Sequence, residues 1–213
     1  MAAPGNTTRM PLRERLGRRL VQLLIGLTAY GVSVALLIEA HLGLDPWDVF
    51  HQGLSRRTGI SIGLMSVLVS GVVLVLWIPL RQRPGVGTVC NAILVGLVID
   101  AALWLLPTAG SWWSRGAFLV GGIALNGLAT GLYIGARLGP GPRDGLMTGL
   151  NARTGRSIRL VRTVIEVTVL VIGFALGGTV GIGTLLYAVS IGPLAHVFIP
   201  LFTVRRAPTA VAG

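Results

Sequence analysis

Two acid–arginine pairs with the same spacing are the groups in this sequence best suited to binding a charged solute. Asp48 precedes Arg57 by nine residues, and Asp144 precedes Arg153 by nine residues. His51 adds a titratable imidazole close to the first acid. In one interpretation these residues form two gates, where arginines and helix N-termini face an anionic or zwitterionic solute. In the other they are structural: each acid favours a helix N-terminus, and each arginine pairs with it or with lipid phosphate.

Both pairs belong to a stretch that the chain contains twice. Residues 42–62 read LGLDPWDVFHQGLSRRTGISI and residues 138–158 read LGPGPRDGLMTGLNARTGRSI, with 11 of 21 positions identical at an offset of 96. Chance would give about one or two matches at average residue usage. A proline near the start and a glycine near the end of each copy predict a short helix of about three turns, on or dipping into a membrane.

The elements that position these motifs are predicted to be membrane-spanning helices. Of 213 residues, 53% are hydrophobic and 12% are charged, whereas soluble domains carry about 25% charged residues. Several apolar runs reach the length of about 20 residues that a transmembrane helix needs. We therefore expect an all-α polytopic membrane protein with six spans. The predicted spans are 20–40, 61–80 and 86–106 in a first repeat (20–106), and 116–136, 160–177 and 181–203 in a second (116–203).

The arginines predict how the chain is oriented. Fifteen of the eighteen fall on one side if both termini are cytoplasmic, as the positive-inside rule favours. This gives a basic cytoplasmic leader (1–19), an external linker (107–115) and a cytoplasmic tail (204–213). The basic residues flank apolar runs, so nucleic acid is not an expected partner. Because each repeat has three spans, the second must be inverted relative to the first, a hallmark of secondary transporters.

Ionisable residues inside predicted spans are further candidates, since charge at membrane depth is costly. Asp100 and His196 occupy matched positions in the two repeats and could form a proton-carrying pair. Alternatively, Asp100 lies near the outer interface and His196 only packs. Glu166 follows Arg162 by four residues, so an ion pair within one helix can explain it, although it is also a proton-coupling candidate.

Small residues recur at four-residue spacing in two predicted spans. Gly127, Gly131 and Gly135 lie in the fourth span, and Gly31 and Ala35 lie at matched positions in the first. Such spacing lets helices approach closely. We expect the first span to pack against the fourth across the repeat interface, with homodimerisation as the other option.

Enzymatic chemistry has no signature in the sequence. The chain has three scattered histidines and one cysteine, and it lacks a metal-ligand cluster, a nucleophile elbow and a phosphate-binding glycine loop. We expect no enzymatic activity, no cofactor and no bound metal.

A family resemblance supports the membrane assignment. With LG-x-x-PWD-x-x-x-x-GLS-x-x-TG at 42–59, PGVGT at 84–88 and LVGLVID at 94–100, the sequence resembles the YczE group of the YitT-like bacterial membrane proteins. The resemblance implies a multi-spanning protein of the bacterial cytoplasmic membrane. The second motif departs from the pattern where Arg143 stands in place of Trp47, so the equivalence of the two copies is in doubt.

Two functions are compatible with these features. The first is a small secondary transporter or exporter of a small solute, working by alternating access between inverted repeats, with proton coupling as an option. The second is a non-transporting membrane subunit that binds a substrate or scaffolds a partner complex. In both cases the expected partners are the lipid bilayer and an unidentified small molecule.

Overall fold

The computed structural model describes residues 15–204, so residues 1–14 of the predicted leader and 205–213 of the predicted tail lie outside the described residues. Residues 16–19, which were predicted to belong to the leader, are the first residues of a helix. Within this part the chain forms helices and connecting loops. The eight helices are α1 (Leu16–Ala40), α2 (Pro46–Thr58), α3 (Ile62–Leu76), α4 (Val86–Leu105), α5 (Trp112–Gly135), α6 (Pro142–Thr154), α7 (Ile158–Ala175) and α8 (Ile182–Phe202).

Local sequence signals set the limits of the motif helices. Pro46 is the first residue of α2, and the Asp45 side chain caps it by accepting a hydrogen bond from the backbone N–H of Asp48 at 2.9 Å. Gly59 ends α2 with a φ of 74°, a left-handed conformation that favours glycine. Pro142 starts α6. The predicted short helix is therefore present in both copies.

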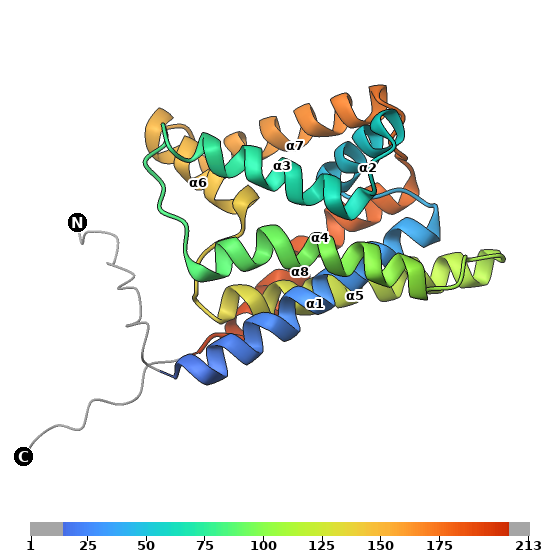
Figure 1. The fold of residues 1–213 in the computed structure, drawn as a ribbon, viewed down its shortest axis with the longest axis horizontal. Helices are drawn as coiled ribbons and strands as arrows, with labels where there is room; N and C mark the ends of the chain where they lie inside the picture. Colours follow the sequence, from blue (N-terminus) through green and yellow to red (C-terminus); the bar gives the residue numbers. More distant parts are fainter. Residues whose placement is uncertain (1–14, 205–213) are drawn as a thin grey trace, which may run out of the picture.

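The helices form two layers (Figure 1). The long helices α1, α4, α5 and α8 lie side by side in one layer, with α1 packed along α5 at its centre. The shorter helices α2, α3, α6 and α7 form the second layer, in which α2 packs against α7 and α3 against α6. The motif helices thus lie in the second layer, each held by a helix from the other half of the chain.

Four helices, α1, α4, α5 and α8, are long and apolar enough to cross a membrane. A fifth crossing results if α2 and α3, which meet at 112°, count as one broken span. The sequence predicts six spans, and the difference lies in the helices that correspond to 61–80 and 160–177. Helix α3 has only 15 residues, and α7 carries Arg159, Arg162 and Glu166.

The two halves repeat helix by helix. Helices α5, α6, α7 and α8 begin 96 residues after α1, α2, α3 and α4, respectively. Contacts between the halves repeat as well: the N–H of Gly87 donates to the carbonyl of Leu138 at 3.0 Å, and the N–H of Gly183 donates to the carbonyl of Leu42 at 2.7 Å. The loop before each motif helix therefore docks on the last long helix of the other half.

The packing of α3 on α4 is not repeated in the second half. Helix α3 packs on α4, but α7 makes no comparable contact with α8. In the α3–α4 contact, a Cβ on Gly63 would lie 2.1 Å from the carbonyl oxygen of Gly96. The equivalent residues are Arg159 and Gly192, and a Cβ on Gly192 would meet open space. A glycine-dependent contact in the first half is thus absent from the second.

The predicted stripe of small residues packs within one half of the chain. Added Cβ atoms on Gly127, Gly131 and Gly135 would meet Leu194, Phe198 and Phe202, all of α8. At the matched positions in α1, Gly31 faces Val98 of α4 and Ala35 is fully buried. The predicted packing of the first span on the fourth is present, since α1 packs along α5. The glycines of the stripe, however, mainly contact the neighbouring long helix: α8 in the case of α5 and α4 in the case of Gly31.

Candidate functional site

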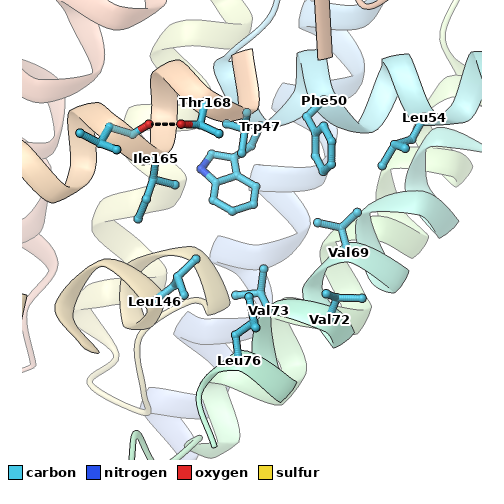
Figure 2. A pocket seen from close by; sticks show the side chains of 12 residues that line it. Trp47, Phe50, Leu54, Val69, Val72, Val73, Leu76, Leu146, Ile165 and Thr168 are labelled. Carbon is cyan, nitrogen blue, oxygen red and sulfur yellow. Dashed lines mark hydrogen bonds between the residues drawn. The ribbon is translucent and has the colours of Figure 1, made fainter. Parts of the chain in front are cut away.

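An apolar groove of about 440 Å³ runs between α3 and α7 (Figure 2). Four residues of α3 and four of α7 form its sides, Trp47, Phe50 and Leu54 of α2 line one end, and Leu146 of α6 lines the other. Thr168 is the one side chain with a hydroxyl, and it donates to the carbonyl of Val164 in its own helix at 2.7 Å. The groove can therefore accept an apolar group.

Trp47 connects this groove to a charged residue of the second motif. The guanidinium carbon of Arg143 lies 5.3 Å from the centroid of the indole ring, a cation–π distance. Trp47 and Arg143 occupy the same position in the two copies of the motif. Equivalent residues that contact each other must lie close to any axis that relates the two halves.

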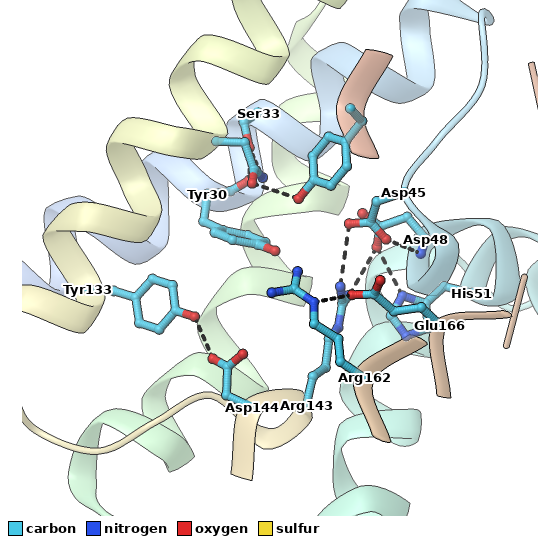
Figure 3. A network of polar contacts seen from close by, with 12 residues as sticks. Tyr30, Ser33, Asp45, Asp48, His51, Tyr133, Arg143, Asp144, Arg162 and Glu166 are labelled. Carbon is cyan, nitrogen blue, oxygen red and sulfur yellow. Dashed lines mark hydrogen bonds and ion pairs between the residues drawn. The ribbon is translucent and has the colours of Figure 1, made fainter. Parts of the chain in front are cut away.

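Arg143 joins the N-termini of the two motif helices (Figure 3). Its Nη1 atom lies 3.4 Å from Oδ2 of Asp45, and its Nη2 atom lies 3.2 Å from Oδ1 of Asp48. The two aspartate side chains are 3% and 2% exposed, whereas the Arg143 side chain is 23% exposed. A guanidinium from α6 therefore offsets part of the charge of two buried carboxylates at the start of α2.

His51 completes this cluster from the next turn of α2. Its Nδ1 atom lies 3.1 Å from Oδ1 of Asp48, so that oxygen is shared between His51 and Arg143. The second oxygen of Asp48 is buried without a hydrogen-bond partner in the described residues. Burial and, to a smaller extent, the neighbouring Asp48 carboxylate raise the pKa of the Asp45 carboxyl to about 6, although Arg143 opposes the shift. Asp45 can thus gain or lose a proton at mildly acidic pH.

The predicted acid–arginine pairs do not form within the motifs. Arg57 is exposed and donates from Nε to the carbonyl of Leu176 at 3.4 Å. Arg153 is exposed and donates from Nη2 to the carbonyl of Pro79 at 2.6 Å. Arg57 thus holds the C-terminal end of α2 against the segment after α7, and Arg153 holds the C-terminal end of α6 against the segment after α3. The sequence analysis did not predict that Arg143 pairs with acids of the first motif. The available signal was that Arg143 places a charge at the motif position where the first copy has Trp47.

Among the described residues, none of the predicted proton-coupling residues, Asp100, His196 and Glu166, forms an ion pair with the Asp45–Arg143 cluster. Asp100 accepts three hydrogen bonds at the start of α3: from the Ser61 hydroxyl at 2.6 Å and from the N–H groups of Gly63 and Leu64 at 2.8 and 3.1 Å. His196 is exposed on α8 and makes no ion pair with Asp100 in the described part of the chain. Asp100 is therefore a cap for α3.

Glu166 forms the ion pair within one helix that its spacing allows. Its Oε1 atom lies 2.8 Å from Nε of Arg162 in α7, and the two side chains are 31% and 55% exposed. The pair lies beside the Asp45–Arg143 cluster (Figure 3).

A small polar cavity of about 30 Å³ lies at the start of α6. Side chains from α1, α3, α4, α5 and α6 line it: Tyr30, Ser66, Ser70, Asn91, Tyr133, Arg143 and Asp144. Asp144 accepts a hydrogen bond from the Tyr133 hydroxyl at 2.8 Å. Within residues 15–204, no three His, Cys, Asp or Glu side chains lie close enough to hold a metal ion.

Known proteins match this chain over most of its length. The model of a family of unknown function, DUF6198, matches residues 17–200. An uncharacterized protein of Haemophilus influenzae is 41% identical over 177 residues, covering 83% of this chain and 81% of that protein. The uncharacterized membrane protein YczE of Bacillus subtilis is 32% identical over 192 residues, covering 89% of each chain. The uncharacterized protein YyaS of the same bacterium is 30% identical over 181 residues, covering 83% of this chain and 90% of YyaS. No solved structure matches.

Proposed function

This chain belongs to the DUF6198 family, and we propose that it acts in the membrane as a small secondary transporter built from two inverted repeats. Its relative YczE is described as a membrane protein, and four helices of the present chain have the length and composition of membrane spans. In the proposed arrangement α3 and α7 complete six crossings, and both termini are cytoplasmic.

The observation that carries this proposal is the meeting of the two motif helices at their N-termini. Asp45 and Asp48 at the start of α2 bond to Arg143 at the start of α6. Transporters with inverted repeats bind their solutes at such a place, where the N-termini of discontinuous helices approach the repeat interface. The contact between the equivalent residues Trp47 and Arg143 supports a pseudo-twofold axis through this point.

The unequal packing of the two halves supports alternating access. In this proposal the packed α3–α4 pair is the closed side, and the separated α7–α8 pair is the open side. Arg159 replaces Gly63, so α7 cannot approach α8 as closely as α3 approaches α4. The two access states are therefore not equivalent in their packing.

The ion cluster supplies a route for proton coupling. When Asp45 takes up a proton, its bond to Arg143 loses the charge of the carboxylate and weakens. One edge of the guanidinium then becomes free for an anionic group of the solute. An apolar part of the same solute would fit the adjoining groove, which is separated from Arg143 by Trp47.

Cysteine labelling tests the inverted arrangement. Thr58 and Thr154 are exposed, occupy equivalent positions and end α2 and α6. In a Cys90→Ala background, Thr58→Cys and Thr154→Cys should react with an impermeant maleimide from opposite sides of the membrane. Labelling of both from one side would contradict the inverted repeat.

Uptake into proteoliposomes tests transport itself. A bacterial metabolite extract is supplied outside at acidic pH, and accumulated solutes are identified by mass spectrometry. The wild-type protein should accumulate a solute that Arg143→Gln does not. If solutes bind to the wild-type protein but none accumulates, the non-transporting binding subunit is the better interpretation.

A further inference from the structure

Asp144 lacks the counter-ion that its counterpart in the first motif has. Asp48 and Asp144 occupy the same motif position. Asp48 bonds to Arg143 and His51, whereas the bond to Asp144 comes from the neutral hydroxyl of Tyr133. Among the described residues no cationic group forms an ion pair with Asp144. A partly buried carboxylate without a cation is costly unless a ligand balances its charge.

The cavity beside Asp144 presents oxygen atoms that have no protein partner. The side chains of Tyr30, Ser66, Ser70 and Asn91 line it and make no hydrogen bond within the part of the chain that the structure describes. Ser66 is only 5% exposed. Tyr30, Ser70 and Asn91 are half-buried. Polar groups in such places normally form hydrogen bonds, so this group of unbonded side chains around one small cavity suits a ligand or ordered water.

The equivalent residues of the second half form an ion pair and a hydrogen bond with one another. The counterparts of Ser66, Ser70, Asn91 and Tyr30 are Arg162, Glu166, Tyr187 and Asn126. Arg162 pairs with Glu166 at 2.8 Å, and Tyr187 donates to Asn126 at 2.9 Å. The second half thus pairs these groups with one another, whereas the first half leaves its oxygens free.

The ligand chemistry follows from these atoms. Hydroxyl, carboxamide and carboxylate oxygens suit a hard cation, and a single carboxylate suits a charge of +1 better than a charge of +2. A cavity of about 30 Å³ has room for one ion with about one water. Arg143 also borders the cavity and would repel a cation, but its guanidinium bonds to Asp45 and Asp48. Arg162 also interacts with Asp144, but it forms an ion pair with Glu166. The four acids of this region thus outnumber its two arginines.

We propose that Asp144, with Ser66, Ser70, Asn91 and Tyr30, forms a binding site for a monovalent cation. The sequence predicts no metal because it lacks a cluster of histidines and cysteines, whereas this site uses neutral oxygens from three helices around one acid of a fourth. The site does not depend on the proposed transport function. A transporter would use it for a coupling ion, and a binding subunit would use it to stabilise its fold.

Sodium-dependent unfolding of the purified full chain in detergent tests the site. Sodium chloride is titrated against choline chloride at constant total chloride, and sodium gluconate replaces sodium chloride in a parallel series. The melting temperature should rise with sodium, saturate, and be the same with either anion. Asp144→Asn should abolish the rise. Ser66→Ala with Ser70→Ala keeps the carboxylate and should raise the half-saturating sodium concentration about tenfold or more.

Asp100→Asn is the control, because it changes a carboxylate at the start of α3 that does not line the cavity, and it should keep the sodium response. Binding of radioactive sodium to the wild type and to the double serine variant provides a second readout if Asp144→Asn does not fold. A wild-type protein that does not respond to sodium, a response that follows chloride, or a full response in Asp144→Asn would overturn the proposal.

Discussion

The indole of Trp47 and the guanidinium of Arg143 contact each other at 5.3 Å, although the two residues occupy the same position in two copies of one motif. This difference between the copies therefore also joins them. The guanidinium reaches Asp45 and Asp48 as well, and Asp45 and His51 stand where the second copy has Gly141 and Met147. Three departures from the repeat thus form the buried ion cluster together with Asp48.

Removing Arg143 should destabilise the fold strongly. Arg143→Leu leaves the buried carboxylates of Asp45 and Asp48 without a cation, and breaking a buried pair in this way costs about 3 kcal/mol. Thermal or denaturant unfolding in detergent measures the loss. Adding Asp45→Asn and Asp48→Asn to Arg143→Leu removes the unpaired charges and should recover part of the stability. A single variant as stable as the wild type would show that the cluster does not hold α2 and α6 together.

The contact between α3 and α4 should depend on glycine in one half only. Gly63→Ala places a Cβ about where the carbonyl oxygen of Gly96 lies, at 2.1 Å, so the helices must separate and the melting temperature should fall. Gly192→Ala meets open space and should be neutral or stabilising by up to about 1 kcal/mol, because alanine favours helix over glycine. Equal effects of the two substitutions would contradict the asymmetry between the halves.

Asp100 should behave as a helix cap. Asp100→Ala removes an acceptor for three donors at the start of α3 and should cost about 1–2 kcal/mol of unfolding free energy. Asp100→Asn keeps one carbonyl oxygen and should cost less. Neither variant should change the pH dependence of uptake, whereas Asp45→Asn should. A pH dependence lost in Asp100→Asn alone would restore the prediction that Asp100 carries the proton.

Acidic pH should stabilise the fold through Asp45. The pKa of this carboxyl rises from 3.8 to about 6 because the group is buried. A group whose pKa is higher in the folded state contributes its full stability below 3.8, and that contribution is lost as the pH rises through about 6. Between these values the melting temperature of the wild type should therefore fall more steeply than that of Asp45→Asn, which retains the helix cap. Parallel curves would assign the titration to another group.

The sequence by itself determined the features that depend on nearby residues and on composition. The offset of 96 indicated the duplication, and Asp45, Pro46 and Gly59 predicted the limits of α2, because caps and turns act within a few residues of the chain. The spacing of Arg162 and Glu166 predicted their ion pair for the same reason. The apolar runs predicted membrane helices, although α3 was expected to be longer than it is.

Only the tertiary structure decided which residues meet. Arg143 bonds to acids that lie 95 and 98 residues earlier in the chain, and Asp100 bonds to the start of a different helix. Such partners depend on how the helices pack, which spacing along one helix does not reveal. The same is true of the cavity beside Asp144. Three helices bring its unbonded oxygens together around an acid for which the sequence suggested an arginine nine residues away as partner.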